Sequence, residues 1–326
     1  MSYAIAGNPA TREEWLEARR GVITATDIGA ILGLNPYKSR TDLWLEKNGL
    51  AADKEETGAM WLGKAFEEVC AKWWSERMGR EVCPHGSLVI SDCGRFGATP
   101  DYTVDTEGVR ELLETKTTVL RAAQGIGFDP YQQGTDRVPE SYLLQCQWQM
   151  LLTETNVCHL ALLVLDVREL WVYEIHRCDD LIAKCVRAAE EFLECLKGDM
   201  PEITGEHPRD LKTLAELYPD GEGEPIHATE EDEALIARFE MAQADLKRAE
   251  VNKEILEAQI KSRMGESPAL LFGEGYKQKL TWKTQGGRTD WKGLALSFSP
   301  TTDQIAASVS APTRVFRHPF KSGKES

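Results

Sequence analysis

Apolar residues recur at helical spacing in six stretches of the first 200 residues. The stretches are 11–20, 27–32, 41–48, 55–78, 141–152 and 180–197, and in each the apolar side chains share one helix face. Thr11 opens a Thr-x-x-Glu capping box, and Thr26 occupies the expected N-cap of the second helix. Gly21, Gly49 and Gly198 follow helix ends, where glycine terminates helices.

Runs rich in β-branched and aromatic residues predict five strands. They are 82–89, 96–105, 108–117, 159–166 and 170–177. Residues 120–139, rich in Gly, Gln and Pro, predict a loop. The alternation of these elements predicts an α/β fold in which helices flank a mixed central sheet.

The pattern changes after residue 200. Residues 201–228 are acidic and rich in Pro and Gly, which predicts a linker. Residues 229–265 predict a heptad-patterned helix, a C-terminal coiled-coil-like extension. Residues 266–326 predict a basic strand segment, hairpin-like over 275–292, and a flexible tail from Ser299. The apolar or small heptad residues are Leu235, Phe239, Ala242, Leu246, Ala249, Leu256 and Ile260. This helix could pair with its symmetry mate or with a partner protein, or fold back on the core; we favour the last because so few heptads are marginal alone.

Composition excludes few function classes. The net charge of −15 is unusual for a DNA-binding protein, yet residues 266–326 carry nine basic and five acidic side chains, and metal-binding acids attract cations that attract phosphate. The chain has no apolar run of about 20 residues and no export signal at its N-terminus, so we expect a cytoplasmic protein without a membrane partner. The eight cysteines form no Cys-x-x-Cys pair, which favours reduced, mostly buried thiols.

Residues 95–118 carry the strongest chemical signal. Asp101 follows a proline, and after twelve intervening residues comes Glu114-x-Lys116. Because side chains alternate along a strand, Glu114 and Lys116 project to one side while Leu113 and Thr115 project towards the core. Two carboxylates bind a divalent cation such as Mg²⁺, and a lysine beside them can orient a water for attack on a phosphodiester. The alternative is a surface hairpin with an ion pair.

Two further sites are suggested by helices. Arg19 and the hydroxyl of Thr26 could hold a phosphate at the start of the second helix, or Thr26 could merely cap the helix while Arg19 pairs with an acid. Glu67 lies near the buried side of the long helix, where a carboxylate needs a partner or a metal. Alternatively, Glu67, like its neighbour Glu68, is an ordinary helix charge exposed to solvent.

Five ordered pieces of sequence together resemble a known family. They are ARRGVITATD, WLGKAFEE, GATPDYTVD, ELLETKTT and YLLQCQWQM, and they resemble the phage lambda exonuclease and YqaJ-like viral recombinase nucleases of the PD-(D/E)xK superfamily over residues 10–200. The resemblance implies a restriction-endonuclease-like core and Mg²⁺-dependent 5′→3′ digestion of linear duplex DNA to 3′ overhangs for recombination, with Mn²⁺ able to substitute. It also implies a phage or prophage origin, a single-strand annealing protein as partner and a ring-shaped homotrimer.

The resemblance assigns roles to individual residues. The metal ligands would be Glu67, Asp101, Glu114 and the backbone carbonyl of Thr115, and the catalytic set would be Asp101, Glu114, Lys116 and Glu67. The residues that bind the 5′-phosphate and DNA would be Arg19, Thr26 and Gln145. Thr26 replaces the serine of the family pattern, and Gln147 and Gln149 leave the register of the glutamine open.

Three other functions remain open from the sequence. A PD-(D/E)xK endonuclease would cut closed circles. An iron–sulfur nuclease would need a cysteine trio that the spacing of Cys178, Cys185 and Cys195 does not supply. A non-catalytic DNA-binding or assembly module would use the heptad helix.

Overall fold

The computed structural model describes residues 3–6, 12–51, 57–106, 108–219, 223–271, 279–282, 298, 301–302 and 304. The chain forms two compact units, Met1–Tyr218 and Pro219–Ser326. Each unit is described by itself. Within the described residues, no helix is long and apolar enough to cross a bilayer.

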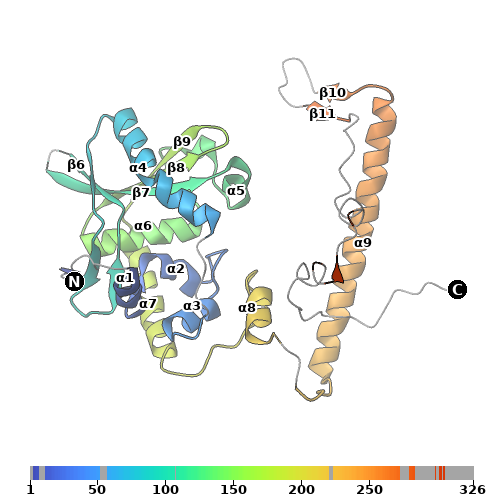
Figure 1. The fold of residues 1–326 in the computed structure, drawn as a ribbon, viewed down its shortest axis with the longest axis horizontal. Helices are drawn as coiled ribbons and strands as arrows, with labels where there is room; N and C mark the ends of the chain where they lie inside the picture. Colours follow the sequence, from blue (N-terminus) through green and yellow to red (C-terminus); the bar gives the residue numbers. More distant parts are fainter. Residues whose placement is uncertain are drawn as a thin grey trace. The chain divides into compact units, whose positions relative to one another are not determined.

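A five-stranded mixed sheet forms the centre of the first unit (Figure 1). Its order is β3 (Val82–Pro84), β6 (Tyr102–Thr106), β7 (Val109–Thr118), β8 (Val157–Val164) and β9 (Glu169–His176). Strands β7 and β8 are parallel, and the other neighbours are antiparallel. The predicted α/β fold with a mixed sheet and flanking helices is confirmed.

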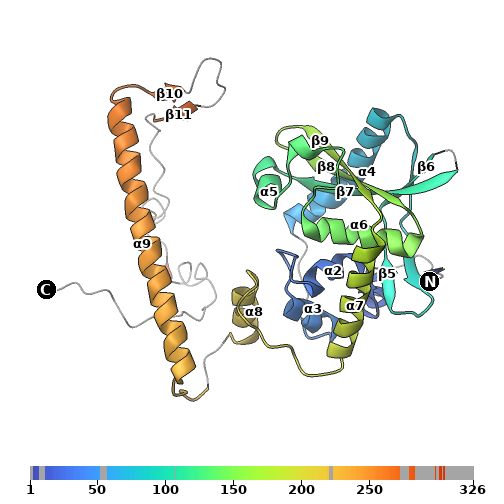
Figure 2. The same cartoon turned by 180° about the vertical axis from the view of Figure 1, so that it is seen from behind.

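Helices α4 (Gly58–Met78) and α6 (Glu140–Thr153) cover opposite faces of this sheet (Figures 1 and 2). On the α4 face, Trp74 packs with Leu113 of β7 and with β8. On the α6 face, Met150 packs with Leu112 of β7. Both faces of β7 are therefore buried, whereas the sequence predicts that only the side carrying Leu113 faces the core.

A second sheet and further helices also belong to this unit. The sheet has the order β1 (Tyr3–Ala6), β4 (Leu88–Ser91), β5 (Phe96–Ala98) and β2 (Ile23–Thr24). Helices α2 (Ala25–Ile31), α3 (Arg40–Lys47) and α7 (Asp179–Cys195) bury their apolar faces against α6 in one cluster. Helix α1 (Arg12–Arg20) precedes β2.

Three predicted segments are divided differently in the structure. The strand predicted over 82–89 is split into β3 and β4, and the strand predicted over 96–105 is split into β5 and β6, with the members of each pair in different sheets. The predicted loop over 120–139 contains helix α5 (Leu120–Gly125) and a 3₁₀ turn at Pro130–Gln132. The break between β5 and β6 contains Asp101, one of the predicted site residues.

Gly97 is needed where β5 meets β2. It pairs with Thr24 in parallel register, and a Cβ on Gly97 would lie 2.8 Å from Cγ2 of the buried Val22. We therefore expect Gly97→Ala to overpack this junction and to lower the free energy of unfolding by about 1–3 kcal/mol. Thermal melting measures the effect.

Gly63→Ala is the matched control, because Gly63 lies within α4 and its added Cβ would meet no atom within 4 Å. Alanine is the better helix former, so this variant should melt at or slightly above the wild-type temperature. Equal melting of the two variants would contradict the steric argument.

Part of the predicted linker over 201–228 is a helix that packs on the first unit. Helix α8 (Asp210–Leu217) donates a hydrogen bond from Thr213 Oγ1 to Asp42 Oδ1 of α3 at 2.6 Å. Arg209, the residue before the helix, pairs with the other oxygen of Asp42 at 3.1 Å. The first unit accordingly extends to Tyr218 rather than ending near residue 200.

The second unit is built on helix α9 (Glu230–Met264). Thr229 and Asp232 form a capping box at its start, and most of its apolar heptad residues are exposed. Strands β10 (Ala269–Leu271) and β11 (Lys279–Thr281) form an antiparallel pair after it. The rest of the predicted 275–292 hairpin, and the tail from Ser299 apart from 301–302 and 304, lie outside the described residues. The preference for a helix folded back on the core stays a prediction.

All eight cysteines are free thiols. Four are buried, whereas Cys83, Cys93 and Cys178 are exposed and Cys195 is intermediate. The expectation of mostly buried thiols therefore holds for only half of them.

Candidate active site

The candidate site lies where β6 and β7 separate. The last residue pair between these strands is Tyr102 with Leu113, so Asp101 and Glu114 occupy the next positions, at the point where the strands part. The backbone N–H of Thr115 has no β6 partner here and donates to Asp101 Oδ2 at 2.9 Å, and the Thr115 hydroxyl donates to the same oxygen at 3.0 Å. Asp101 is thereby fixed beside the Glu-x-Lys segment.

Glu114 is the most enclosed acid of the site. Its residue is 1% exposed, because α6 covers this face of β7. Oε1 accepts hydrogen bonds from Lys116 Nζ and from Gln145 Nε2, the latter at 2.5 Å, and Oε2 accepts from Gln149 Nε2 at 2.7 Å. The surface-hairpin alternative does not describe this pair, since Glu114 is buried and its partner Lys116 is partly buried.

Lys116 is held by a second contact as well. Its ammonium lies 5.7 Å from the centre of the Tyr142 ring on α6, within the range of a cation–π interaction. Burial lowers the pKa of Lys116, but the charges of Glu114 and Asp101 outweigh burial and raise it above the ordinary value. Lys116 is accordingly protonated at neutral pH and acts as a fixed positive charge and hydrogen-bond donor.

The acids repel one another. Burial first, and then the charge of Glu114, raises the pKa of Asp101 to about 7. The same two causes raise the pKa of Glu67 on α4. Glu67 is partly buried while its neighbour Glu68 is exposed, and Glu67 interacts electrostatically with Glu114 and Asp101. The role of Glu67 as a metal ligand stays a prediction.

The donor set suits a hard divalent cation. Carboxylate and carbonyl oxygens are the ligands that Mg²⁺ prefers, and a cation would relieve the repulsion that raises the pKa of Asp101. Gln149 Oε1, beside Glu114, is buried without a hydrogen-bond partner among the described residues. In the part of the chain that the structure describes, no three His, Cys, Asp or Glu side chains converge closely enough to hold a metal ion as they stand. Metal binding would thus require the contacts of Glu114 to rearrange.

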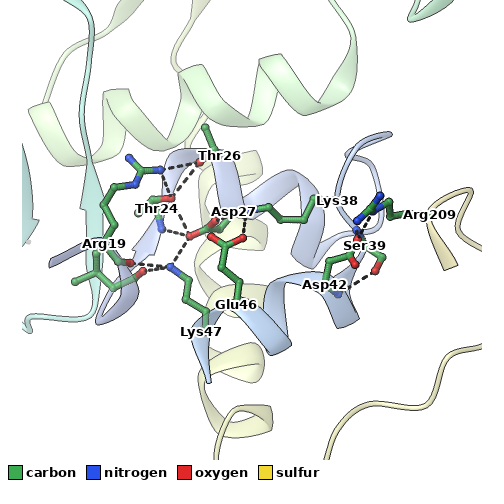
Figure 3. Close-up of polar contacts among 11 residues, drawn as sticks. Arg19, Thr24, Thr26, Asp27, Lys38, Ser39, Asp42, Glu46, Lys47 and Arg209 are labelled. Atoms are coloured by element: carbon green, nitrogen blue, oxygen red, sulfur yellow. Dashed lines mark hydrogen bonds and ion pairs between the residues drawn. The ribbon is translucent and has the colours of Figure 1, made fainter. Parts of the chain in front are cut away.

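A second polar cluster joins α1 to β2 and α2. Arg19 Nη2 donates to Thr26 Oγ1 at 3.1 Å and to Thr24 Oγ1 at 3.3 Å (Figure 3). The structure brings Arg19 and Thr26 together as predicted, but the N-cap of α2 is Thr24, not Thr26. Thr24 takes this role because β2 ends at it and its N–H and hydroxyl both donate to Asp27 Oδ2.

Helix α6 links the two clusters. Its Ser141 packs against Gly29 of α2, where an added Cβ would lie 3.2 Å from Ser141 Cβ, and its Gln145 and Gln149 reach Glu114 one and two turns further on. Gln147 points elsewhere, donating to the carbonyl of His176. The register left open by the sequence therefore places Gln145 and Gln149 at the site.

Sequence reasoning missed three residues of these clusters: Thr24, Lys47 and Tyr142. Tyr142 could have been found, since 142, 145 and 149 share one face of a helix. Lys47 gave no signal, because its partners are at least 20 residues away in the chain.

All candidate residues lie within a segment that matches a known family of domains. Residues 14–156 match the YqaJ-like viral recombinase domain family. The uncharacterized protein YqaJ of Bacillus subtilis (strain 168) is 25% identical over 302 residues, which cover 90% of this chain and 91% of that protein. The uncharacterized protein R354 of Acanthamoeba polyphaga mimivirus is 29% identical over 167 residues, which cover 49% of this chain and 30% of that protein.

Solved structures with a similar arrangement include two exonucleases. An alkaline exonuclease (LHK-Exo) from Laribacter hongkongensis has a TM-score of 0.45 and 22% identity, covering 63% of this chain and 99% of that chain. A phage-related exonuclease from Haemophilus somnus 129PT has a TM-score of 0.44 and 13% identity, covering 57% of this chain and 100% of that chain.

Proposed function

We propose that the chain is a metal-dependent deoxyribonuclease, because residues 14–156 match the YqaJ-like viral recombinase domain family and the protein YqaJ is similar over 90% of the chain. It digests linear double-stranded DNA from 5′-phosphorylated ends in the 5′→3′ direction. The products are 3′ single-stranded overhangs for homologous recombination.

The arrangement of Asp101, Glu114 and Lys116 at the separation of β6 and β7 carries this proposal. Hydrolysis of a phosphodiester needs a positioned water and positive charge near the phosphorus. Burial and the charge of Glu114 raise the affinity of Asp101 for a proton, and a cation would relieve the same repulsion. Together with a protonated lysine paired to Glu114, these acids supply both requirements in one place.

Mg²⁺ is the proposed cofactor, with Mn²⁺ able to replace it. Glu67, Asp101, Glu114 and the carbonyl of Thr115 would hold the ion. When bound, the metal supplies Lewis-acid activation of water and stabilises charge on the phosphate oxygens.

The protein's own groups position the reactants. Lys116 donates a hydrogen bond that orients the attacking water, and the Tyr142 ring keeps the ammonium at the site. Gln145 and Gln149 hold the carboxylate of Glu114 from α6, and these two hydrogen bonds would rearrange when Glu114 takes up the ion.

Arg19 and Thr26 would bind the terminal 5′-phosphate. A guanidinium and a hydroxyl are donors to phosphate oxygens, and the contact between α2 and α6 places them in the same unit as the acids. Binding the end in this way would impose polarity. A single-strand annealing protein as partner and a ring-shaped homotrimer around the DNA complete the proposal.

One assay tests the proposal. Purified full-length protein is incubated with Mg²⁺ and three duplexes: linear with 5′-phosphate, linear with 5′-hydroxyl, and closed circular. We expect the 5′-phosphorylated duplex to be degraded fastest and the circle to remain intact. Lys116→Met should be inactive, while Lys184→Met, which changes an exposed lysine of α7, should behave as the wild type.

Cutting of the circle would instead assign an endonuclease. If neither the wild type nor Lys116→Met degraded any of the three duplexes, with or without Mg²⁺, the protein would instead be a non-catalytic DNA-binding module.

A further inference from the structure

Lys47, at the end of α3, is buried among three acceptors (Figure 3). Its side chain is 4% exposed, and Nζ lies 2.8 Å from Asp27 Oδ2. The same ammonium donates to the backbone carbonyls of Arg19 at 2.8 Å and Val22 at 2.6 Å. These two carbonyls lie at the end of α1 and just after it, so Lys47 fixes where the chain leaves α1.

The hydroxyls beside Arg19 have different roles because of Asp27. Thr24 has one hydroxyl proton, which it donates to Asp27 Oδ2 at 2.8 Å, so Thr24 can only accept from Arg19. Thr26 Oγ1 lies 3.2 Å from Thr24 Oγ1 and makes no such bond to Asp27. Thr26 is therefore the donor in its contact with Thr24, and a phosphate oxygen could replace Thr24 as the acceptor of this proton, while Thr24 orients the guanidinium.

The charge of Asp27 would compete for Arg19 if Lys47 were absent. Burial raises the pKa of Asp27, but Lys47 and then Lys38 outweigh burial and hold it below the ordinary value. Lys38 is 3.9 Å from Asp27 and closer to Glu46, at 2.7 Å. A buried carboxylate that loses its nearest cation attracts the next one, and Asp27 already acts electrostatically on Arg19.

We propose that Lys47 is a positioning residue for the phosphate-binding group: it neutralises Asp27 and anchors the end of α1, and so keeps the Arg19 guanidinium on Thr24 and Thr26. That the bound anion is a DNA 5′-phosphate rests on the proposed function. The effect of Lys47 on the position of the Arg19 guanidinium is independent of the proposed function.

The first experiment measures binding without catalysis. Fluorescence anisotropy in EDTA compares linear duplexes with 5′-phosphate and 5′-hydroxyl ends. The wild type should prefer the phosphate, and Lys47→Met should reduce the preference by about tenfold, the range expected when one charge-assisted hydrogen bond is lost. Lys38→Met is the matched control, because Lys38 is farther from Asp27; its preference should change by less than about twofold.

A double variant separates positioning from packing. Asp27→Asn combined with Lys47→Met removes both charges, so nothing draws Arg19 away, and the preference should recover to within about threefold of the wild type. If Lys47 and Asp27 only stabilise the fold, the second substitution should lower stability further and the 5′-phosphate preference should not recover. Melting curves of each variant show that it is folded.

A crystal structure of Lys47→Met tests the inference independently of DNA. The Arg19 guanidinium should be found on the carboxylate of Asp27. If it stays on Thr24 and Thr26, or if the double variant binds no better than Lys47→Met, the positioning role is overturned. A wild type that shows no 5′-phosphate preference would count against the proposed function, and the crystal structure would then decide on Lys47 alone.

Discussion

Glu114→Gln is expected to abolish DNA hydrolysis, with a loss of about 10³-fold or more, corresponding to about 4 kcal/mol of transition-state stabilisation. The substitution keeps the shape of the side chain but removes the negative charge that pairs with Lys116. One of its two acceptor oxygens also becomes a donor, which would face the amide of Gln145 or Gln149. Degradation of a linear 5′-phosphorylated duplex under single-turnover conditions measures the loss.

Glu111→Gln provides the control on the same strand. Glu111 lies three residues earlier on β7 and pairs with Arg80 at 2.5 Å and with His159 at 2.7 Å, away from the separation of β6 and β7. The same chemical change should lower stability there, since a partly buried pair loses its negative partner, but leave the rate on DNA within about threefold of the wild type. If the two variants lost equal activity, the loss would reflect folding and not the chemistry of Glu114.

Helix positions were predictable because they depend on local pattern. The sequence predicts a helix over 141–152 and the structure has one at Glu140–Thr153; it predicts 229–265 and the structure has Glu230–Met264. In both cases a long 3.6-residue rhythm and a terminal signal occur in the same stretch. The start of α2 was less predictable, because Thr24 and Thr26 are both good N-cap residues and only the hydrogen bonds to Asp27 distinguish them.

Strand breaks were not predictable, because they depend on contacts between distant parts of the chain. Residues 96–105 alternate as one strand would, yet β5 pairs with β2 and β4 while β6 pairs with β3 and β7. The switch from one sheet to the other occurs at Pro100 and Asp101. A proline is compatible with either outcome, so the local sequence could not show that Asp101 lies in a gap between two sheets.

The acids of the site were predictable, but their surroundings were not. Strand alternation places Glu114 and Lys116 on one side, and the structure keeps them together. The burial of Glu114 comes from α6, which lies about 30 residues later in the chain. In the same way, the sequence identifies Arg19 and Thr26 but not Lys47, because an isolated lysine at a helix end usually interacts with the last carbonyls of its own helix.

Asp101→Asn is expected to stabilise the protein when divalent ions are removed. In the folded protein burial and Glu114 raise the pKa of Asp101 to about 7, from an ordinary value of 3.8. The folded state therefore binds a proton more tightly than the unfolded state between these pH values, and the stability contributed by this group falls as pH rises from about 4 to about 7. Asparagine has no such proton to lose. At pH 8 in EDTA the variant should be more stable by about 2 kcal/mol, because a shift of one pKa unit corresponds to about 1.4 kcal/mol and the acids share the repulsion.

Adding Mg²⁺ at pH 8 should reverse this order. Above the dissociation constant, the free energy of unfolding of the wild type rises with the logarithm of the Mg²⁺ concentration. The variant gains less, because it lacks the negative charge of the Asp101 carboxylate that would bind the ion. Melting curves at pH 5 and pH 8, each with EDTA and with Mg²⁺, give the four comparisons. At pH 5 in EDTA, Asp101 is protonated in the fold and the two proteins should melt within a few degrees of each other. A wild type that is the more stable protein in EDTA at pH 8 would show that Asp101 is not repelled by Glu114 and Glu67, and the argument that these acids await a cation would fail with it.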